Sequence, residues 1–200
     1  VDDNNNVYFT GGFSDIDGQP INYVAKVSAS DGSLDYSFNP KVNSYVDALA
    51  VDSSEKLFIG GDFSMANMEN IKNIVKINSF DESVDYTFAP DCNGSVKSIR
   101  LDNNGSIYIS GYFTNIDGIS RNRIAKLNTV TGAVDALFDP NSDGVVNSII
   151  LDGLGSLYAG GSFTTIGGLT KKNLAKLNTI DGAADFAFTA DTNGSVYKIT

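Results

Sequence analysis

A 50-residue repeat constrains the fold of this chain more than any other sequence feature. The 200 residues divide without a gap into four repeats, 1–50, 51–100, 101–150 and 151–200. A period near 50 residues is typical of propellers and other arrays in which one structural unit stacks on the next. We therefore expect one domain of four similar units over residues 1–200, either a whole protein or part of a longer repeat protein. Seven positions are identical in all four repeats, namely Asp2, Gly11, Phe13, Lys26, Asp35, Phe38 and Val46 with their equivalents at intervals of 50.

Each repeat contains four short runs that favour β-structure. In the second complete unit these runs cover residues 46–51, 57–63, 73–78 and 84–88. Runs of five to seven residues separated by turn residues are typical of all-β proteins. No segment shows a sustained period of 3.6 residues, so almost no helix is expected. The sequence predicts an all-β propeller of four four-stranded blades.

The invariant residues have structural interpretations. Gly11 and its equivalents lie in the second strand, where a missing Cβ lets a neighbouring backbone or a Phe approach closely. The Phe13 and Phe38 sets are expected to form apolar layers between blades. Lys26 and Asp35 flank a hairpin turn, which favours a cross-strand ion pair in every repeat.

The two ends of the chain belong to different parts of the repeat. Residues 195–200 match the first strand of a unit, as in residues 94–100, whereas the chain begins directly after such a strand. This offset predicts that the C-terminal strand completes the N-terminal blade, the velcro closure of propellers. Four complete blades would then form a closed ring.

The repeat pattern resembles a known family. Each unit approximates V-x-x-[IL]-x-[VL]-D-x-x-x-x-[LIV]-[YF]-x-x-G-x-F-[ST], followed by [AV]-K-[LIV]-[NS] and D-x-x-F, most clearly in residues 96–114, 125–128 and 135–140. This pattern resembles the delta-60 repeat β-propeller family over the whole chain. The resemblance implies a propeller in a secreted or cell-surface protein, most often bacterial, and implies no activity.

Composition excludes several classes of function. A net charge of −10 disfavours a nucleic-acid partner and an anionic membrane surface. The absence of His excludes Ser–His and Cys–His catalysis and His-ligated zinc. Cys92 is the single cysteine, so no internal disulfide forms. The chain has no run of 18 apolar residues and no basic segment followed by an apolar stretch, so neither membrane insertion nor a signal peptide is expected in this chain.

Enzyme chemistry has little support. A glycosidase needs two carboxyl groups about 5–9.5 Å apart. Of the three glutamates, Glu69 is the one expected in a long loop, and it can be paired only with Asp91 or Asp143. We therefore expect a protein that is not an enzyme, with a carbohydrate-active enzyme as the least favoured alternative.

The expected topology places the loops on two faces. Short turns join the first strand to the second and the third to the fourth, forming a tight-turn face. The loop face carries the longer loops, residues 18–23, 66–73, 118–123 and 168–173, and the blade connections, 41–45, 91–93, 141–143 and 191–193. Variable loops on a rigid scaffold are the usual location of binding, although loops also vary where nothing selects them. The candidate binding residues, which break the repeat, are Tyr23, Tyr45, Glu69, Tyr112, Arg121, Arg123, Lys171 and Lys172.

One segment suggests a metal. Asp139, Asn141 and Asp143 supply oxygen donors at positions 1, 3 and 5 of a calcium-type loop, with Gly144 at position 6. Position 12 is Ile150 rather than Glu, which favours a structural turn. Calcium is thus a weak candidate, and no other cofactor is expected.

These observations favour a non-catalytic extracellular scaffold that binds a protein or a carbohydrate on the loop face, for example in adhesion. The alternative is an assembly module. If the four units do not close, the edge strands at 1–10 and 195–200 are free to pair between chains. Two chains would then form an eight-bladed ring, or many chains a filament.

Overall fold

The computed structural model describes all 200 residues, and its regular elements are strands only. The all-β prediction is confirmed. The structure contains no helix of the length and hydrophobicity needed to cross a lipid bilayer. The strands are β1 (Asn6–Thr10), β2 (Val24–Ser28), β3 (Val46–Val51), β4 (Lys56–Gly61), β5 (Ile74–Asn78), β6 (Val96–Leu101), β7 (Ser106–Gly111), β8 (Asn115–Ile116), β9 (Ile119–Ser120), β10 (Ile124–Asn128), β11 (Val145–Leu151), β12 (Ser156–Ser162), β13 (Thr165–Ile166), β14 (Leu169–Thr170) and β15 (Leu174–Asn178).

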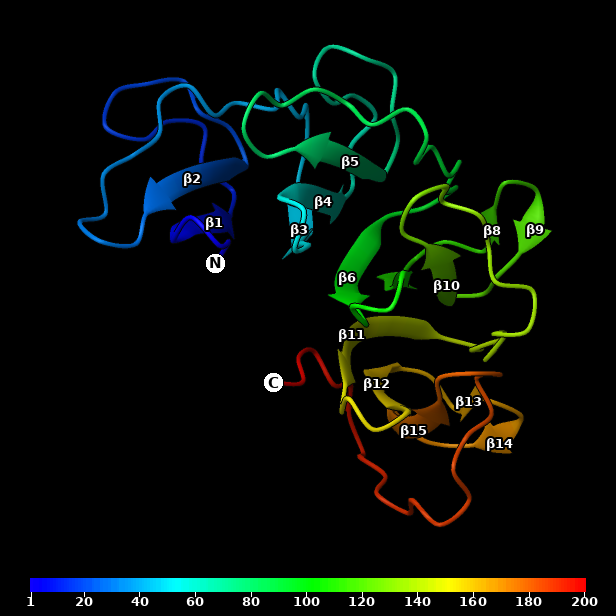
Figure 1. Ribbon diagram of the computed structural model, residues 1–200. Coiled ribbons are helices and arrows are strands. Elements are labelled where there is room, and N and C mark those ends of the chain that lie inside the picture. The colour runs from blue at the N-terminus through cyan, green and yellow to red at the C-terminus, as the bar shows by residue number, and fades with distance from the viewer.

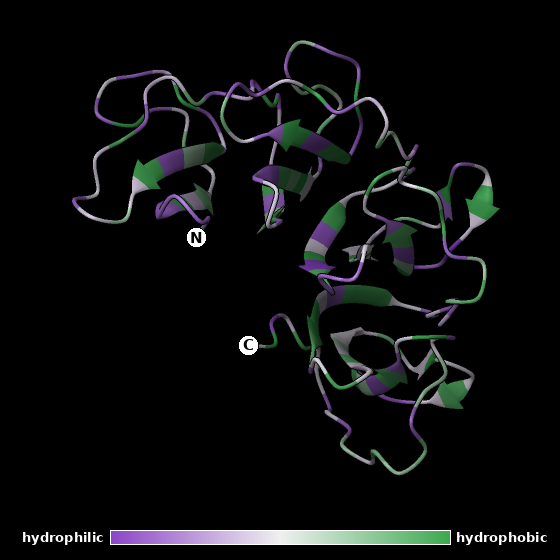
Figure 2. Ribbon diagram, viewed as in Figure 1, coloured by the Kyte–Doolittle hydropathy of each residue, from purple (hydrophilic) through white to green (hydrophobic).

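The strands form one small antiparallel sheet per repeat. These sheets are β1–β2, β3–β4–β5, β6–β7–β10 and β11–β12–β15, and the sheet of one repeat with its turns and loops is called a blade below. The two-residue hairpins β8–β9 and β13–β14 lie within the loops that precede β10 and β15. Apolar residues are mixed with polar ones along β5 and β6 (Figure 2), and the first four residues of β5 are all buried, as expected for a sheet covered by neighbours on both faces.

The predicted fourth strand is reduced to a single bridge. In the second blade, Ile77 pairs with Val84 and the chain then leaves the sheet. The reason is local, because the side chain of Asp85 accepts hydrogen bonds from the backbone N–H of Thr87 at 3.1 Å and from its hydroxyl at 2.5 Å. Such side-chain-to-backbone bonds offer the chain a turn in place of a ladder.

The core lies between the blades and contains the invariant phenylalanines. Phe88, Phe113 and Phe138 are no more than 2% exposed. Phe138 meets Tyr108 edge to face, with ring centroids 5.3 Å apart. The predicted apolar layers are confirmed for the inner blades, whereas Phe13 and Phe188 at the two ends are only partly buried.

The invariant glycine of the second strand allows two backbones to meet. A Cβ on Gly111 would lie 2.0 Å from the carbonyl oxygen of Ser95, and Gly61 and Gly161 are equally close to Tyr45 and Val145. Each contact lies at a β-bulge, where the strand register shifts between Val46 and Ala48, between Val96 and Ser98, or between Val146 and Ser148. The predicted close approach is therefore confirmed.

The four blades form an open arc rather than a closed ring. Figure 1 shows β3, β6 and β11 around a central opening, with the two chain ends on either side of a gap. The predicted velcro closure is not formed, because β1 pairs with β2 alone and residues 195–200 lie against the fourth blade. There, Val196 and Ile199 pack over Gly160 as Val96 and Ile99 of β6 pack over Gly60. Residues 195–200 thus occupy the position of the inner strand of a further blade.

Candidate functional site

The predicted sorting of loops onto two faces agrees with the hydrogen bonds. On the loop face, Asn43 in a blade connection accepts bonds from the backbone N–H groups of Ser64 and Met65, both at 3.0 Å. On the tight-turn face, the N–H of Thr129 donates to the carbonyl of Gly105 at 3.0 Å. The connections between blades therefore lie on the same face as the long loops, and the short turns lie together on the other face.

A lysine links each blade to the next on the tight-turn face. The Nζ of Lys76 lies 3.0 Å from Asp85 of its own blade and donates to the carbonyl of Thr129 in the next blade at 3.0 Å. It also lies 5.5 Å from the centroid of the Phe58 ring. Lys26 and Lys126 repeat this arrangement. The Lys–Asp pairs are structural, as the repeat predicted.

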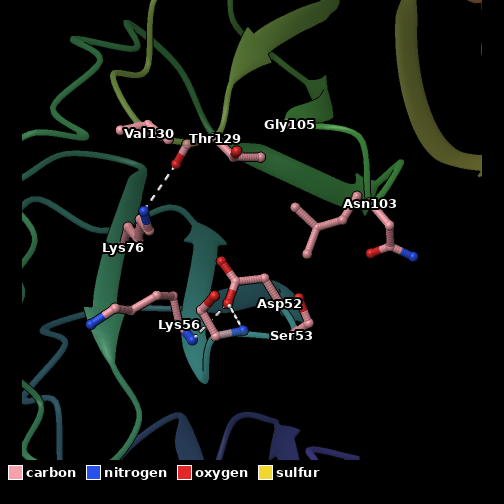
Figure 3. Close-up of a pocket in the computed structure, with 10 residues that line it drawn as sticks. Asp52, Ser53, Lys56, Lys76, Asn103, Gly105, Thr129 and Val130 are labelled. Carbon is pink, nitrogen blue, oxygen red and sulfur yellow. Dashed lines mark hydrogen bonds between the residues drawn. The ribbon is translucent and has the colours of Figure 1, made fainter.

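The groove beside this lysine is an inter-blade seam. Figure 3 shows it between the turns of the second and third blades, where it encloses a cavity of about 300 Å³. Two of its polar groups already have partners, since Lys76 is bound to Thr129 and Asp52 accepts bonds from the N–H groups of Ser54 and Lys56. The side chains of Lys56 and Asn103 also line the groove.

Two of the predicted binding residues are buried within their blades. Arg121 is 7% exposed and donates to the carbonyls of Asp135 and Ala136, at 3.0 and 3.2 Å. Lys171, at the equivalent position, donates to the carbonyl of Phe188. Burial removes both from the accessible surface that the sequence suggested for them. The first repeat has Ile21 at this position, and an apolar residue there was the feature of the sequence that could have indicated burial.

The calcium-type loop uses its oxygens for structural bonds. Asp139 lies 3.7 Å from Arg121, and Asn141 accepts a bond from Asn122. Asp143 accepts bonds from Thr164 and Thr165 (the equivalent of Asn43 with Ser64 and Met65). The structure places no three Asp, Glu, Cys or His side chains together as a metal site.

The hydrogen bonds also explain the acidity of Asp143. Burial raises the pKa of its carboxyl group, but the bonds from Thr164 and Thr165 outweigh burial and lower the pKa to about 2. The carboxyl group of Asp143 is therefore ionised at neutral pH, and the hydrogen bonds from Thr164 and Thr165 stabilise its negative charge.

Two tyrosines, the half-buried Tyr23 and the exposed Tyr45, meet at the inner rim of the loop face, beside the start of β3. Tyr23 and Tyr45 contact each other with ring centroids 5.5 Å apart, and Tyr45 is 60% exposed. A Cβ built on Gly12 would lie 3.7 Å from the Tyr45 ring, an ordinary van der Waals contact, so the ring packs beside the backbone of Gly12.

A second group combines aromatic and cationic side chains. Tyr112 is 50% exposed, and the Nζ of Lys97 lies 5.7 Å from the centroid of its ring. The same Nζ forms a 2.9 Å ion pair with Asp47. Arg123 donates to the carbonyl of Tyr112. The structure thus brings Tyr112 and Arg123 together, as it does Tyr23 and Tyr45.

Tyr23 and Arg123 share an unusual backbone conformation that the sequence did not reveal. Position 23 of every repeat has a positive φ, 63° at Tyr23 and 68° at Arg123. Asn73 and Asn173 occupy it in the other repeats, and Asn is among the few residues that tolerate this region. Asn73 also donates to the carbonyl of Cys92 at 2.9 Å, as Asn173 does to Thr192. The recurrence of Asn was the signal that could have identified the position.

Glu69 and Lys172 are exposed on the loop face and have no hydrogen bond or ion pair with these tyrosines. Desolvation and the nearby Glu69 carboxylate raise the pKa of Tyr86. The backbone N–H of Lys172 donates to Asp191 at 2.9 Å. The structure therefore gathers four of the eight predicted residues, Tyr23, Tyr45, Tyr112 and Arg123, into two contacting pairs.

A family model described as a domain of unknown function (DUF5122) beta-propeller matches residues 4–38, 100–138 and 155–188. The three segments together cover more than half of the chain. The search of curated proteins found no match to this chain.

Proposed function

The chain belongs to the DUF5122 β-propeller family, and from this premise we propose that it is a non-catalytic binding scaffold. The blades form a rigid frame, and the loop face presents the ligand-binding surface. The delta-60 type of its repeat pattern supports a secreted or cell-surface location and a role in adhesion. The partner is a protein or a carbohydrate.

One observation carries this proposal. At position 23 the chain has Tyr and Arg in two repeats, where Asn would fit the left-handed backbone and donate a hydrogen bond. Strained backbone of this kind costs about 1–3 kcal/mol and clusters at functional sites. Both substitutions place a large side chain beside an exposed tyrosine, Tyr45 or Tyr112.

The chemistry of these pairs suits recognition. Tyrosine combines a large apolar ring with a hydroxyl group, so it gains contact area without requiring a dry surface. Tyr and Arg are also the residue types that dominate binding energy at interfaces. We infer that the ligand lies across Tyr23, Tyr45, Tyr112 and Arg123 at the inner rim of the loop face.

Restoring Asn at both strained positions, as Tyr23→Asn with Arg123→Asn, is expected to separate stability from binding. Each site would regain an unstrained conformation and a hydrogen bond, raising the free energy of unfolding by about 1 kcal/mol. Binding to the ligand is expected to fall at least tenfold. The measurements are urea denaturation and binding to immobilised pectin, xylan, chitin and mucin.

The matched control is Tyr36→Asn, which removes an exposed tyrosine outside the loop-face pairs. It is expected to leave binding unchanged. If the double variant binds every probe as tightly as the wild-type chain, the proposed surface is wrong.

A second candidate function is assembly, for which the open arc is the specific support. The edge of β1 opposite β2 has no partner, and residues 195–200 are seated as an inner strand without a second strand beside them. Such edges are templates for pairing with another chain. Head-to-tail pairing of this kind produces rings or filaments.

Native mass spectrometry distinguishes the two arrangements. Assembly predicts multiples of 21.2 kDa. A species at the monomer mass at all concentrations would contradict assembly and favour pairing of residues 195–200 with β1 of the same chain, which is the closed four-bladed ring.

A further inference from the structure

The centre of the arc contains a cavity that is distinct from the loop-face surface. It encloses about 330 Å³ between β3, β6, β11 and residues 195–200. These are the segments that border the central opening in Figure 1. The residues that line it include Asp47, Lys97, Arg100, Asn147 and Lys198.

Hydrogen bonds between neighbouring inner strands hold the wall of this cavity. The hydroxyl of Ser98 accepts a bond from the backbone N–H of Ile149 at 3.3 Å, and Ser148 accepts one from Ile199 at 3.1 Å. The amide of Asn147 donates to the carbonyl of Val196 at 3.0 Å. The side chains that line the cavity therefore project from strands that are hydrogen-bonded to one another.

The cavity is electropositive in a chain whose net charge is −10. Three cations, Lys97, Arg100 and Lys198, line it together with a single carboxylate, Asp47. Lys97 forms an ion pair with Asp47 at 2.9 Å, which neutralises both groups. Arg100 and Lys198 form no ion pair, so two positive charges remain.

Arg100 is the less exposed of the two. Its side chain is half-buried, and its one protein hydrogen bond runs from Nη1 to the carbonyl of the preceding residue, Ile99, at 2.7 Å. Desolvation lowers the pKa of Arg100, because no anion offsets the loss of water. A desolvated guanidinium that lacks a carboxylate is costly to the folded state. Its planar fork matches the geometry of a carboxylate or a phosphate.

We propose that this central cavity binds a small oxyanion, a carboxylated sugar or a free phosphate, through the guanidinium of Arg100 and the ammonium of Lys198. Tyr197 and the neutral Lys97–Asp47 pair form the rest of the wall. Arg100 and Lys198 are not among the four residues proposed on the loop face, although Lys97 in the cavity wall also lies 5.7 Å from the centroid of the Tyr112 ring.

The test is calorimetric titration of the 200-residue chain with trigalacturonate, with its neutral methyl ester and with inorganic phosphate. We expect one of the two anions to bind and the ester not to bind. Arg100→Gln is expected to weaken binding at least tenfold, the usual effect of losing a charge-assisted bond. Tighter binding of trigalacturonate than of phosphate would identify a sugar ligand, and the reverse order a phosphate ligand.

Two further variants keep the test decisive. Lys56→Gln changes the net charge equally but lies on the tight-turn face, and it is expected to bind as the wild-type chain does. Arg100→Lys retains the positive charge but lacks the planar guanidinium. This variant is expected to bind the anion more weakly than the wild-type chain does. It tests the site even if Arg100→Gln does not fold. The proposal is overturned if neither anion binds, if the ester binds equally, or if Lys56→Gln weakens binding as much as Arg100→Gln.

The same titration separates this site from the loop face. The double variant Tyr23→Asn with Arg123→Asn is expected to bind the anion normally. Failure of the pectin, xylan, chitin and mucin assays therefore leaves the cavity proposal intact, and failure of the anion titration leaves the loop-face proposal intact.

Discussion

Gly111→Ala is expected to destabilise the third blade by about 3 kcal/mol or more. The added Cβ would lie 2.0 Å from the carbonyl oxygen of Ser95 and 3.0 Å from the N of Lys97. Both atoms belong to backbone at a β-bulge, so the clash cannot be relieved by rotating a side chain. Urea denaturation followed by circular dichroism measures the effect.

The first repeat provides the control. Gly11→Ala introduces the same methyl group, but there the nearest atoms belong to the side chain of Phe13 at 3.0 Å. No inner strand lies beside β1, so a small movement of the ring is sufficient. If Gly11→Ala and Gly111→Ala unfold at the same urea concentration, the inter-strand contact is not what requires glycine.

Lys76→Met is expected to lower the free energy of unfolding by about 2–4 kcal/mol. The substitution keeps the apolar stem but removes the charge that lies 3.0 Å from both Asp85 and the carbonyl of Thr129. The side chain of Lys76 is 8% exposed, so both acceptors would remain poorly solvated and without their partner. Denaturation midpoints at neutral pH measure the loss.

The equivalent change in the last repeat tests the cause. Lys176 pairs with Asp185 at 3.5 Å, has a side chain 29% exposed, and has no next blade to supply a carbonyl. Lys176→Met is therefore expected to cost less than about 1 kcal/mol. Equal losses for Lys76→Met and Lys176→Met would contradict a role for the lysine in joining blades.

Features that depend on local chemistry were predictable from the sequence. Alternating apolar residues and turn residues identified the strands, because the strand period and the turn conformations are properties of a few neighbouring residues. The repetition of Phe88, Lys76 and Asp85 at intervals of 50 identified an apolar layer and an ion pair, and both are present.

Features that depend on the three-dimensional surroundings of a residue could not be predicted from the sequence. Arg121 and Lys171 look like surface residues in a variable loop, but each is buried where the first repeat has Ile21. The fourth strand has the right residue types, but the side chain of Asp85 diverts the chain into a turn. The strain at Tyr23 and Arg123 became visible only as backbone angles.

The 50-residue repeat and the strand pattern are enough to establish an all-β array of four units, because both are read from neighbours along the chain. The packing of distant segments is what places residues 195–200 against the fourth blade rather than beside β1. The same packing brings Arg100 and Lys198 to one cavity. Both outcomes depend on which surfaces pack together across the arc, and packing between distant segments is not encoded in any local pattern.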